Sequence, residues 1–262
     1  MAEVLASDHI LNRRESLTQT FEAYRAELDA DNDRRERLII LSRTITQLSK
    51  KLIFHLHRGA TASNNGARKK NLAEARGKER EIWDNFVKVR EVLQNGEPQI
   101  FWRWNRQISP GLEEYIEALS FLHYLEKQSL ITLTEIQSTL SDSETGKQLI
   151  TVTPEDYVLG MSDLTGELMR YATNGKPARD HSRQMLTVTV AQHFDGIPSS
   201  MLHKLTKKQE ETTRSMEKIE KLCYALRLRL LEYADRPDVL RQMAKRALGD
   251  ARDQEGEPGK ED

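Results

Sequence analysis

The sequence lacks the features that mark several common protein classes. Its 262 residues contain a single cysteine, Cys223, so an internal disulfide bond is impossible and a reducing compartment is the expected environment. Cys223 itself is expected to be a small buried hydrophobic residue. The N-terminal segment has no apolar signal-peptide core, and no stretch approaches the roughly 20 apolar residues that span a bilayer. We therefore expect a soluble, intracellular protein with no membrane partner.

The net charge is close to zero, but the charges are unevenly distributed. The chain carries a net charge of −1 at pH 7. Residues 34 to 80, however, contain thirteen lysines or arginines and only three acids, a net charge of +10. A basic block of this size favours a polyanionic partner, although solvated helix faces would show the same pattern.

Several catalytic signatures are also missing. The chain has no glycine-rich phosphate loop, no cysteine cluster and no nucleophile-elbow motif. None of its seven histidines follows a glutamate by three residues, which excludes the Glu-x-x-His motif of di-iron bundles. His55 and His57 lie two residues apart and so point to different helix faces, which argues against a shared metal. We expect them at the surface or facing RNA.

Almost every segment has the apolar spacing of a helix, and none alternates like a strand. Apolar residues at three- and four-residue steps from Leu38 to Leu56 predict a long amphipathic helix that ends at Gly59. A helix over 99–129 has Pro110 and Gly111 as a kink and is apolar on both sides, which places it in the middle of a bundle. Further helices are expected over 67–95, 134–140, 154–174, 180–193 and 200–233.

These helices predict an all-α, single-domain bundle. The bundle is expected over residues 13–248, after a flexible N-terminal segment (1–12) and before a disordered polar tail (249–262). The apolar faces of Leu112–Leu125 and Leu222–Leu231 exceed what one small bundle can cover. Part of this surface is therefore expected to be buried against other subunits.

Two pairs of carboxylates at helical spacing are the most informative feature of the chain. Glu114 and Glu117 lie three residues apart, and Asp163 and Glu167 lie four apart. Each pair therefore projects from one side of its helix, with Cβ atoms about 5–6 Å apart. The first pair continues a stripe that includes Phe121, so two acids occupy positions expected for core residues. Because a buried, uncompensated carboxylate is costly, these acids either hold a cation or meet lysine and arginine partners.

Mg²⁺ is the expected cation, because it takes oxygen ligands and keeps several waters that can attack a phosphodiester in line. Acid pairs at this spacing are also common on solvated helices, so a purely structural role stays open, most of all for Asp163 and Glu167. Gly160 and Gly166 lie within the same helix. A helical glycine lowers stability by about 1 kcal/mol relative to alanine. Close approach of a ligand or another helix is therefore the expected reason for them.

Aromatic and basic residues alternate just before the first acid pair. They are Phe101, Trp102, Arg103, Trp104 and Arg106. Aromatic rings and guanidinium groups together can stack nucleobases and hold phosphates. Packing in the core or against a partner explains the aromatic residues at least as well.

Four segments, taken together and in this order, resemble the Trax (translin-associated factor X) family of the translin superfamily. They are ELDADNDRRERLIILSRTITQLSKKLIFHLHR, GLEEYIEALSFLHYLEKQSLIT, VTPEDYVLGMSDLTGELMRYATN and MEKIEKLCYALRLR. The resemblance implies a translin-like bundle of about seven helices and Mg²⁺-dependent cleavage of RNA, with Mn²⁺ as a possible substitute. It assigns metal binding and catalysis to Glu114, Glu117, Asp163 and Glu167, and the expected products carry 5′-phosphate and 3′-hydroxyl ends.

The resemblance also implies a partner and a substrate. Family members assemble with translin into a hollow octamer that degrades passenger strands during RNA silencing and trims tRNA-derived fragments. Cytoplasmic and nuclear localisation is expected. Five basic residues are expected to position the RNA backbone without reading its sequence: Arg43, Lys50, Lys51, Arg103 and Arg106. The alternative is a non-catalytic, RNA-binding scaffold subunit that stabilises translin.

One departure from the family pattern concerns the helix of the first acid pair. Ser109 and Pro110 precede the GLEEY motif, where helix-compatible residues are expected. A proline at this place could shift the helix that carries Glu114 and Glu117.

Overall fold

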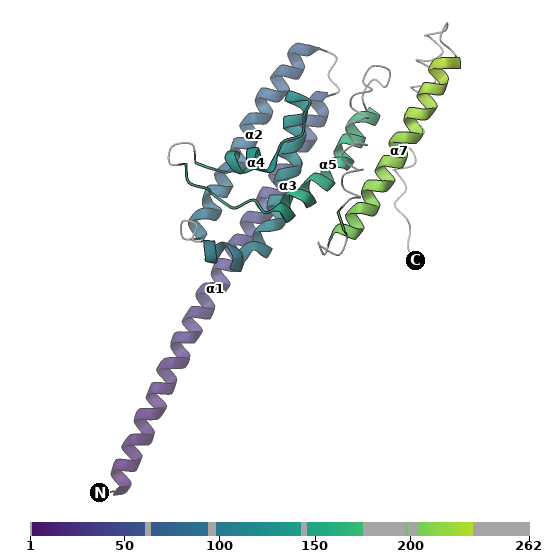
Figure 1. The fold of residues 1–262 in the computed structure, drawn as a ribbon. Coiled ribbons are helices and arrows are strands. Elements are labelled where there is room, and N and C mark those ends of the chain that lie inside the picture. The colour runs from purple at the N-terminus through teal and green to yellow at the C-terminus, as the bar shows by residue number, and fades with distance from the viewer. Residues whose placement is uncertain are drawn as a thin grey trace, which may run out of the picture.

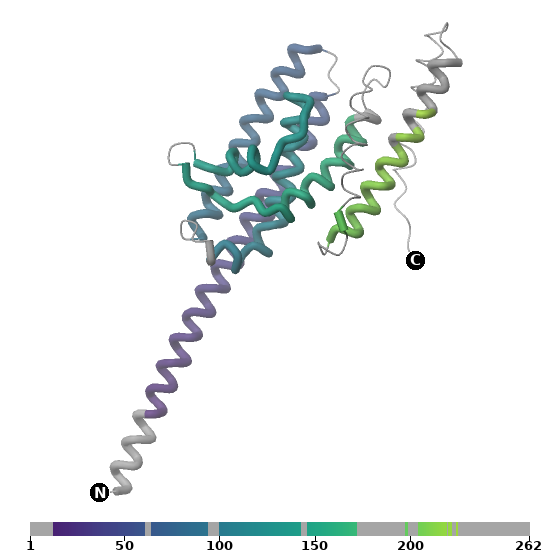
Figure 2. Tube along the Cα trace, in the orientation of Figure 1, coloured from purple at the N-terminus to yellow at the C-terminus, as the bar shows by residue number. Residues whose placement is uncertain are grey.

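Helices form close to where the apolar spacing predicts them in the computed structural model of the chain (Figure 1). The structure describes residues 2–60, 64–93, 98–142, 146–174, 197–198 and 204–232, and Figure 2 traces the chain in the same orientation. These residues form no strand, so the predicted all-α class is confirmed. They form six helices: α1 (Ala2–Ala60), α2 (Asn65–Val92), α3 (Pro98–Lys127), α4 (Leu133–Thr139), α5 (Pro154–Asn174) and α7 (Leu205–Glu232).

Some predicted features fall outside this part of the chain. The helix expected over 180–193 and the polar tail from 249 lie outside the described residues, as does the side chain of Cys223. No helix among the described residues is long and apolar enough to cross a membrane.

α1 is much longer than the apolar stripe from Leu38 to Leu56 predicts. It begins at Ala2 and so includes residues 2–12 of the predicted flexible segment. The first 58 residues contain neither glycine nor proline, the two residues that most strongly oppose a helix. The N-terminal part of α1 extends away from the other helices (Figure 1).

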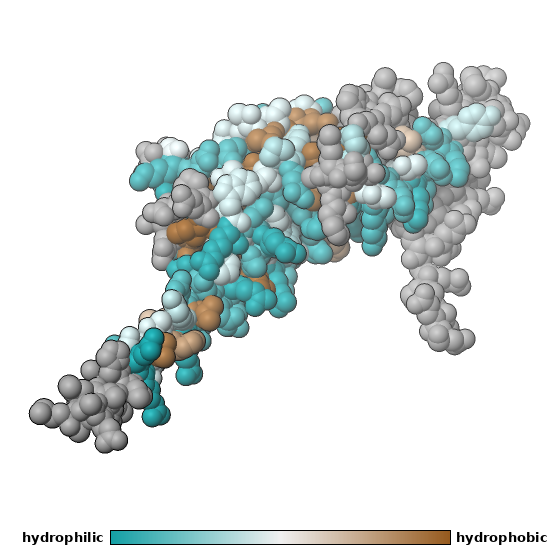
Figure 3. All heavy atoms as spheres, turned by 60° about the horizontal axis from the view of Figure 1, so that its bottom comes forward, coloured by the Kyte–Doolittle hydropathy of each residue, from teal (hydrophilic) through white to brown (hydrophobic). Residues whose placement is uncertain are grey.

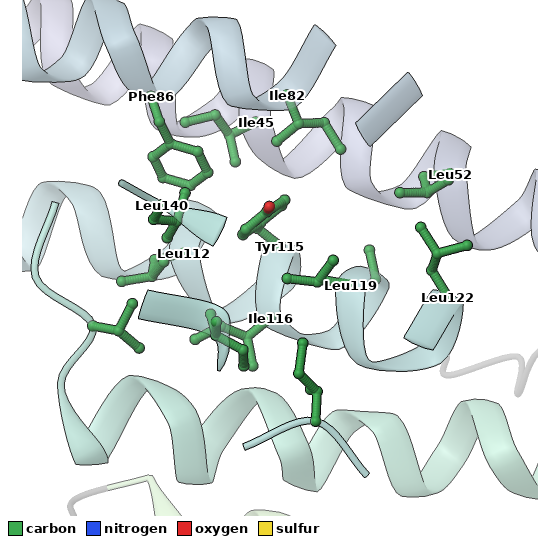
Figure 4. Close-up of a cluster of buried hydrophobic side chains, with 14 of the residues drawn as sticks. Ile45, Leu52, Ile82, Phe86, Leu112, Tyr115, Ile116, Leu119, Leu122 and Leu140 are labelled. Atoms are coloured by element: carbon green, nitrogen blue, oxygen red, sulfur yellow. The ribbon is translucent and has the colours of Figure 1, made fainter. Parts of the chain in front are cut away.

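α3 lies in the middle of the bundle, as its two apolar faces predict, and packs against α1, α2 and α5. Figure 4 shows its side chains between labelled side chains of α1 and α2 on one side and the ribbon of α5 on the other. Each fully buried large apolar side chain contributes roughly 1.5–3 kcal/mol. The labelled α3 residues of this core are Leu112, Tyr115, Ile116, Leu119 and Leu122.

This packing corrects the expectation that part of the Leu112–Leu125 face would need other subunits. Leu112, Leu119 and Leu125 are all buried within the chain itself. Two helices cover one side of α3 and a third covers the other, so little apolar surface is left on it. The side chains of the second expected face, Leu222–Leu231, lie almost entirely outside the described part of the structure.

Pro110 lies inside α3 without ending it. A proline lacks the N–H that would bond the preceding turn, and a serine of α1 makes hydrogen bonds to the backbone on either side of this position. Ser42 Oγ accepts a hydrogen bond from the Gly111 N–H at 3.1 Å and donates one to the Ile108 carbonyl at 3.4 Å. A Cβ atom on Gly111 would lie 2.8 Å from the Ser42 carbonyl oxygen. α1 and α3 therefore meet closely at the turn that precedes the first acid pair.

α5 begins at Pro154, as predicted, and is anchored to α3 at this end. The Thr153 Oγ accepts a hydrogen bond from the Asp156 N–H at 3.1 Å, which caps the helix. The buried Asp156 carboxylate accepts hydrogen bonds from Thr153 and from Ser109 of α3. Burial raises the pKa of Asp156, and these hydrogen bonds oppose the rise.

Farther along α5, Gly160 allows the backbone of α5 to approach that of α3. A Cβ atom at this position would lie 2.7 Å from the Glu113 carbonyl oxygen and 2.8 Å from Ile116 Cβ. The predicted close approach of another helix is therefore found at Gly160. It brings the second acid pair, which follows on α5, to the level of the first pair on α3.

The contact at Gly160 can be tested with two alanine substitutions. Gly160→Ala forces α3 and α5 apart and is expected to lower the stability by about 1–3 kcal/mol. The control is Gly77→Ala on α2, where a Cβ atom would meet nothing within 4 Å. That change is expected to raise the stability by about 0.5–1 kcal/mol. Urea denaturation midpoints measure both, and equal stabilisation by the two alanines would contradict the close contact.

Candidate functional site

The four predicted acids line one open pocket between α1, α3, α5 and α7. Glu114 and Glu117 enter it from α3, and Asp163 and Glu167 enter from α5. The pocket has a volume of about 610 Å³. Its other lining residues are mostly polar: Lys50, Ile53, Phe54, Ser162, Thr165, Gly166, Arg170, Lys208, Glu211, Thr212 and Ser215.

Glu117 is the most buried of the four acids and is only 7% exposed. Among the described residues, no hydrogen bond or ion pair is made by its carboxyl group. Burial, and then repulsion from Glu114, Asp163 and Glu167, raise the pKa of Glu117 from 4.5 to about 9. Without a bound cation, this carboxyl is therefore protonated at neutral pH.

Glu114 and Asp163 show the same conflict between burial and charge. Burial raises the pKa of Glu114, and Lys50, whose Nζ lies 3.6 Å from the carboxylate, opposes the rise. Burial also raises the pKa of Asp163, and the Nζ of Lys208, at 2.6 Å, opposes it. A nearby lysine therefore favours the ionised form of each of these two acids.

Lys208 of α7 contacts both acid-bearing helices, α3 and α5, and its place in the site was not predicted from the sequence. Its Nζ donates to the Asp163 carboxylate and, at 3.0 Å, to the Leu159 carbonyl, and it lies 3.6 Å from Glu113. The buried Glu113 carboxylate also accepts from Lys204 at 2.9 Å. Lys204 and Lys208 are spaced four residues apart, a signal that both face one side of α7.

His57 was expected at the surface or facing RNA, but it is buried. It is 8% exposed, its Nε2 contacts the Glu167 carboxylate, and its ring centroid lies 4.7 Å from that of Phe121. The expectation of a surface position was therefore wrong, because His57 follows the buried Ile53 by one helical turn. The prediction that the two histidines face different sides was right, since His55 contacts Asn71 of α2 instead.

The five basic residues expected to contact RNA lie in different places. Lys50 lines the pocket. Arg43 and Lys51 are exposed elsewhere on α1, and neither lines the pocket. Arg103 and Arg106 lie near the start of α3, also outside the pocket, and Arg103 pairs with an aspartate of α1. Their role in RNA binding stays a prediction.

The aromatic residues next to these arginines divide between core and surface. Phe101 and Trp104 are buried, whereas Trp102 is 60% exposed. Packing in the core therefore accounts for two of the three.

The side chains suit a divalent cation chemically, because four carboxylates from two adjacent helices face one pocket. The most buried of them, Glu117, contacts no basic group among the described residues. As the side chains stand, three of the four acids contact Lys50, His57 or Lys208. No three His, Cys, Asp or Glu side chains of the described residues converge as metal ligands. Binding a cation therefore requires these carboxylates to turn away from their basic partners.

Comparison with known proteins identifies the family and the fold. The Translin family profile matches residues 33–230. Translin-associated protein X of Mus musculus is 35% identical over 231 residues, which cover 80% of this chain and 78% of that protein. Translin of Gallus gallus is 27% identical over 221 residues, or 82% of this chain and 93% of that protein. The crystal structure of AfC3PO has a similar fold, with a TM-score of 0.59 and 20% identity over 80% of this chain and 98% of that one.

The raised pKa of Glu117 predicts how stability depends on pH in the absence of divalent cations. Between pH 4.5 and about 9, the folded chain keeps a proton that the unfolded chain has lost, so stability falls as pH rises. Glu117→Gln removes this group and is expected to flatten the decline and to raise the melting temperature at pH 8. Thermal unfolding in EDTA from pH 5 to 9 measures both effects.

Glu113 provides the matched control, because it is equally buried on α3 but paired with two lysines. Glu113→Gln is expected to lower the melting temperature, since it leaves Lys204 and Lys208 without that charge. Equal pH slopes for the wild type and Glu117→Gln would show that Glu117 is ionised in the folded chain.

Proposed function

The chain belongs to the translin family, and we propose that it is the catalytic, Trax-like subunit of a metal-dependent endoribonuclease that works together with translin. The observation that carries this proposal is the convergence of four acids from α3 and α5 on one open pocket. The similarity to Translin-associated protein X supports it, because it extends through both acid-bearing helices.

Mg²⁺ is the proposed cofactor, with Mn²⁺ as a substitute, and Glu114, Glu117, Asp163 and Glu167 are the residues that would hold it. A bound divalent cation would supply positive charge for a phosphodiester and lower the pKa of a water next to it. The chain's own residues keep the carboxylates in place. Lys208 donates to Asp163 and to a carbonyl of the same helix, and His57 contacts Glu167 from α1.

The proposed substrate is single-stranded or small structured RNA, including silencing passenger strands and tRNA-derived fragments. Lys50 and Arg170 line the pocket and provide positive charge for phosphates at its mouth. Arg43, Lys51, Arg103 and Arg106 are proposed to hold the RNA backbone farther away. The product ends would be 5′-phosphate and 3′-hydroxyl, and the protein would act in the cytoplasm and the nucleus.

The proposed partner is translin, in a hetero-octamer, and α1 offers a surface for such a contact. Four large apolar residues on its projecting part are 56–69% exposed, and Figure 3 shows hydrophobic side chains among polar ones there. Their spacing of four, three and four residues is that of a seam between two helices. Monomers rarely leave such a row uncovered. The row consists of Leu17, Phe21, Tyr24 and Leu28.

The second candidate function is a non-catalytic scaffold subunit that binds RNA and stabilises translin. It is favoured by the basic partners that three of the four acids already have. In that role, the acids and bases would be a structural network between α1, α3, α5 and α7. Metal-dependent turnover distinguishes the two functions.

The catalytic proposal predicts both the products and the effect of one substitution. The chain co-purified with translin is expected to cleave a labelled single-stranded RNA in Mg²⁺ but not in EDTA. The products should carry 5′-phosphate and 3′-hydroxyl ends, because water rather than the 2′-hydroxyl attacks. A single 2′-deoxy residue at the scissile position should therefore leave cleavage in place. Glu117→Gln should reduce the rate by about 100-fold or more without affecting assembly.

Two results would contradict this proposal. Cyclic 2′,3′-phosphate ends, or complete protection by the deoxy residue, would exclude water as the nucleophile. Unchanged turnover by Glu117→Gln in an intact complex would show that the acids take no part in cleavage and would favour the scaffold function.

The α1 row predicts the effect of a charge on assembly. Phe21→Glu places a carboxylate in the seam and is expected to abolish co-purification with translin, because an unpaired charge is costly to bury. Ala26→Glu is the control, because Ala26 is also exposed but lies on the opposite side of the helix. Size-exclusion chromatography of co-expressed chains measures both. Normal assembly of Phe21→Glu would show that translin binds elsewhere.

A further inference from the structure

Phe54 is an exposed aromatic residue at the edge of the acid pocket. Its side chain is 58% exposed, yet it lines the same pocket as the four acids. Of the large apolar side chains that are exposed in the described part of the chain, Phe54 alone lines this pocket. Its neighbour Ile53 points inward and is buried, so the core does not require an aromatic ring at position 54.

Two cationic residues flank Phe54 on the same face of α1. Lys50 and Arg58 lie four residues before and after it, one helical turn on either side. The guanidinium carbon of Arg58 lies 6.0 Å from the centroid of the Phe54 ring. The Nζ of Lys50 lies 3.6 Å from Glu114. The ring therefore lies between two cationic side chains of α1, of which Lys50 also lines the acid pocket.

An aromatic ring between cations is suited to a nucleotide of a single strand. The ring face can stack on a nucleobase of any sequence, while the cations bind the phosphates on either side. A base within a duplex is already paired and stacked, and it would have to leave the helix to reach the ring. An apolar protein interface suits Phe54 less well, because Lys50, Glu114 and Arg170 share the pocket with it.

We propose that Phe54 is a stacking subsite for one unpaired nucleobase, which places the neighbouring phosphate over Glu114, Glu117, Asp163 and Glu167. This inference rests on the proposed function, since it names the surface that holds the RNA at that pocket. Lys50 and Arg58 bind the backbone phosphates that flank the stacked base. The subsite favours single-stranded RNA and reads no sequence, because every base offers a ring face.

The test is a binding cycle that removes the ring and the base separately. The complex with translin is titrated in EDTA with a fluorescent single-stranded RNA, and a single abasic nucleotide is moved along the strand. Phe54→Ala is expected to weaken binding by about 5- to 150-fold. One abasic position should weaken binding to the wild type by a similar factor, yet cause no further loss in Phe54→Ala. Phe54→Trp should restore affinity.

The control variant is Ile40→Ala, which removes a similarly exposed large apolar side chain of α1 outside the pocket and should leave affinity unchanged. Independent, multiplicative losses from the ring and the base would overturn the subsite, as would a loss in Ile40→Ala in place of Phe54→Ala. Failure of Phe54→Ala to assemble with translin would overturn it in favour of a protein contact.

Cleavage in Mg²⁺, measured on the wild-type complex, separates this inference from the proposed function. If the binding cycle gives the expected losses but the wild-type complex does not cleave RNA, the subsite is supported and the nuclease function is contradicted. If the complex cleaves RNA but the ring and the base contribute independently to binding, the nuclease function is supported and the subsite is contradicted.

Discussion

The contact between α3 and α5 at Gly160 is the constraint on which the rest of the site depends. With no room for a Cβ atom, the α5 backbone lies against the Glu113 carbonyl and Ile116. This closeness places two acid pairs in one pocket, where burial and then repulsion from neighbouring acids raise the pKa values of Glu114, Glu117 and Asp163. The neighbouring helices supply positive charge through Lys50 of α1 and Lys208 of α7. The acids are thus the reason why these helices are held to α3 and α5 by charge as well as by apolar packing.

These positive groups differ in how strongly they can hold the acids. Lys50 is largely exposed, so water and salt weaken its attraction to Glu114. Lys208 is mostly buried and bonds both a carboxylate and a carbonyl, so its contact with α5 is stronger. A cation entering the pocket competes with both. Of the two acids that pair with lysine, Glu114 is therefore more easily released to a ligand than Asp163.

The features predicted from the sequence are those set by neighbouring residues in the chain. Helix spans follow from apolar spacing, and the start of α5 follows from Thr153 and Pro154. The acid pairs are visible because three or four residues make one turn. Glu113, Lys208 and His57 belong to the site through contacts between helices, and those depend on how closely the backbones pack. A resemblance to the Trax family identified the four acids but gave no partner for any of them.

Glu117 argues most strongly that the pocket serves a ligand. A purely structural network gains nothing from a buried carboxyl without a partner, because glutamine or an apolar side chain of similar size would fill the same space without repelling three neighbouring acids. The other acids each contact a basic group, whereas among the described residues Glu117 contacts none, and the charge of Lys208 only partly offsets the burial and repulsion that raise the pKa of Glu117 to about 9. A divalent cation would replace the proton on Glu117 and relieve the repulsion at the same time. The unpaired acid at the bottom of the pocket is thus understandable as part of a cation site and has no evident use in a scaffold.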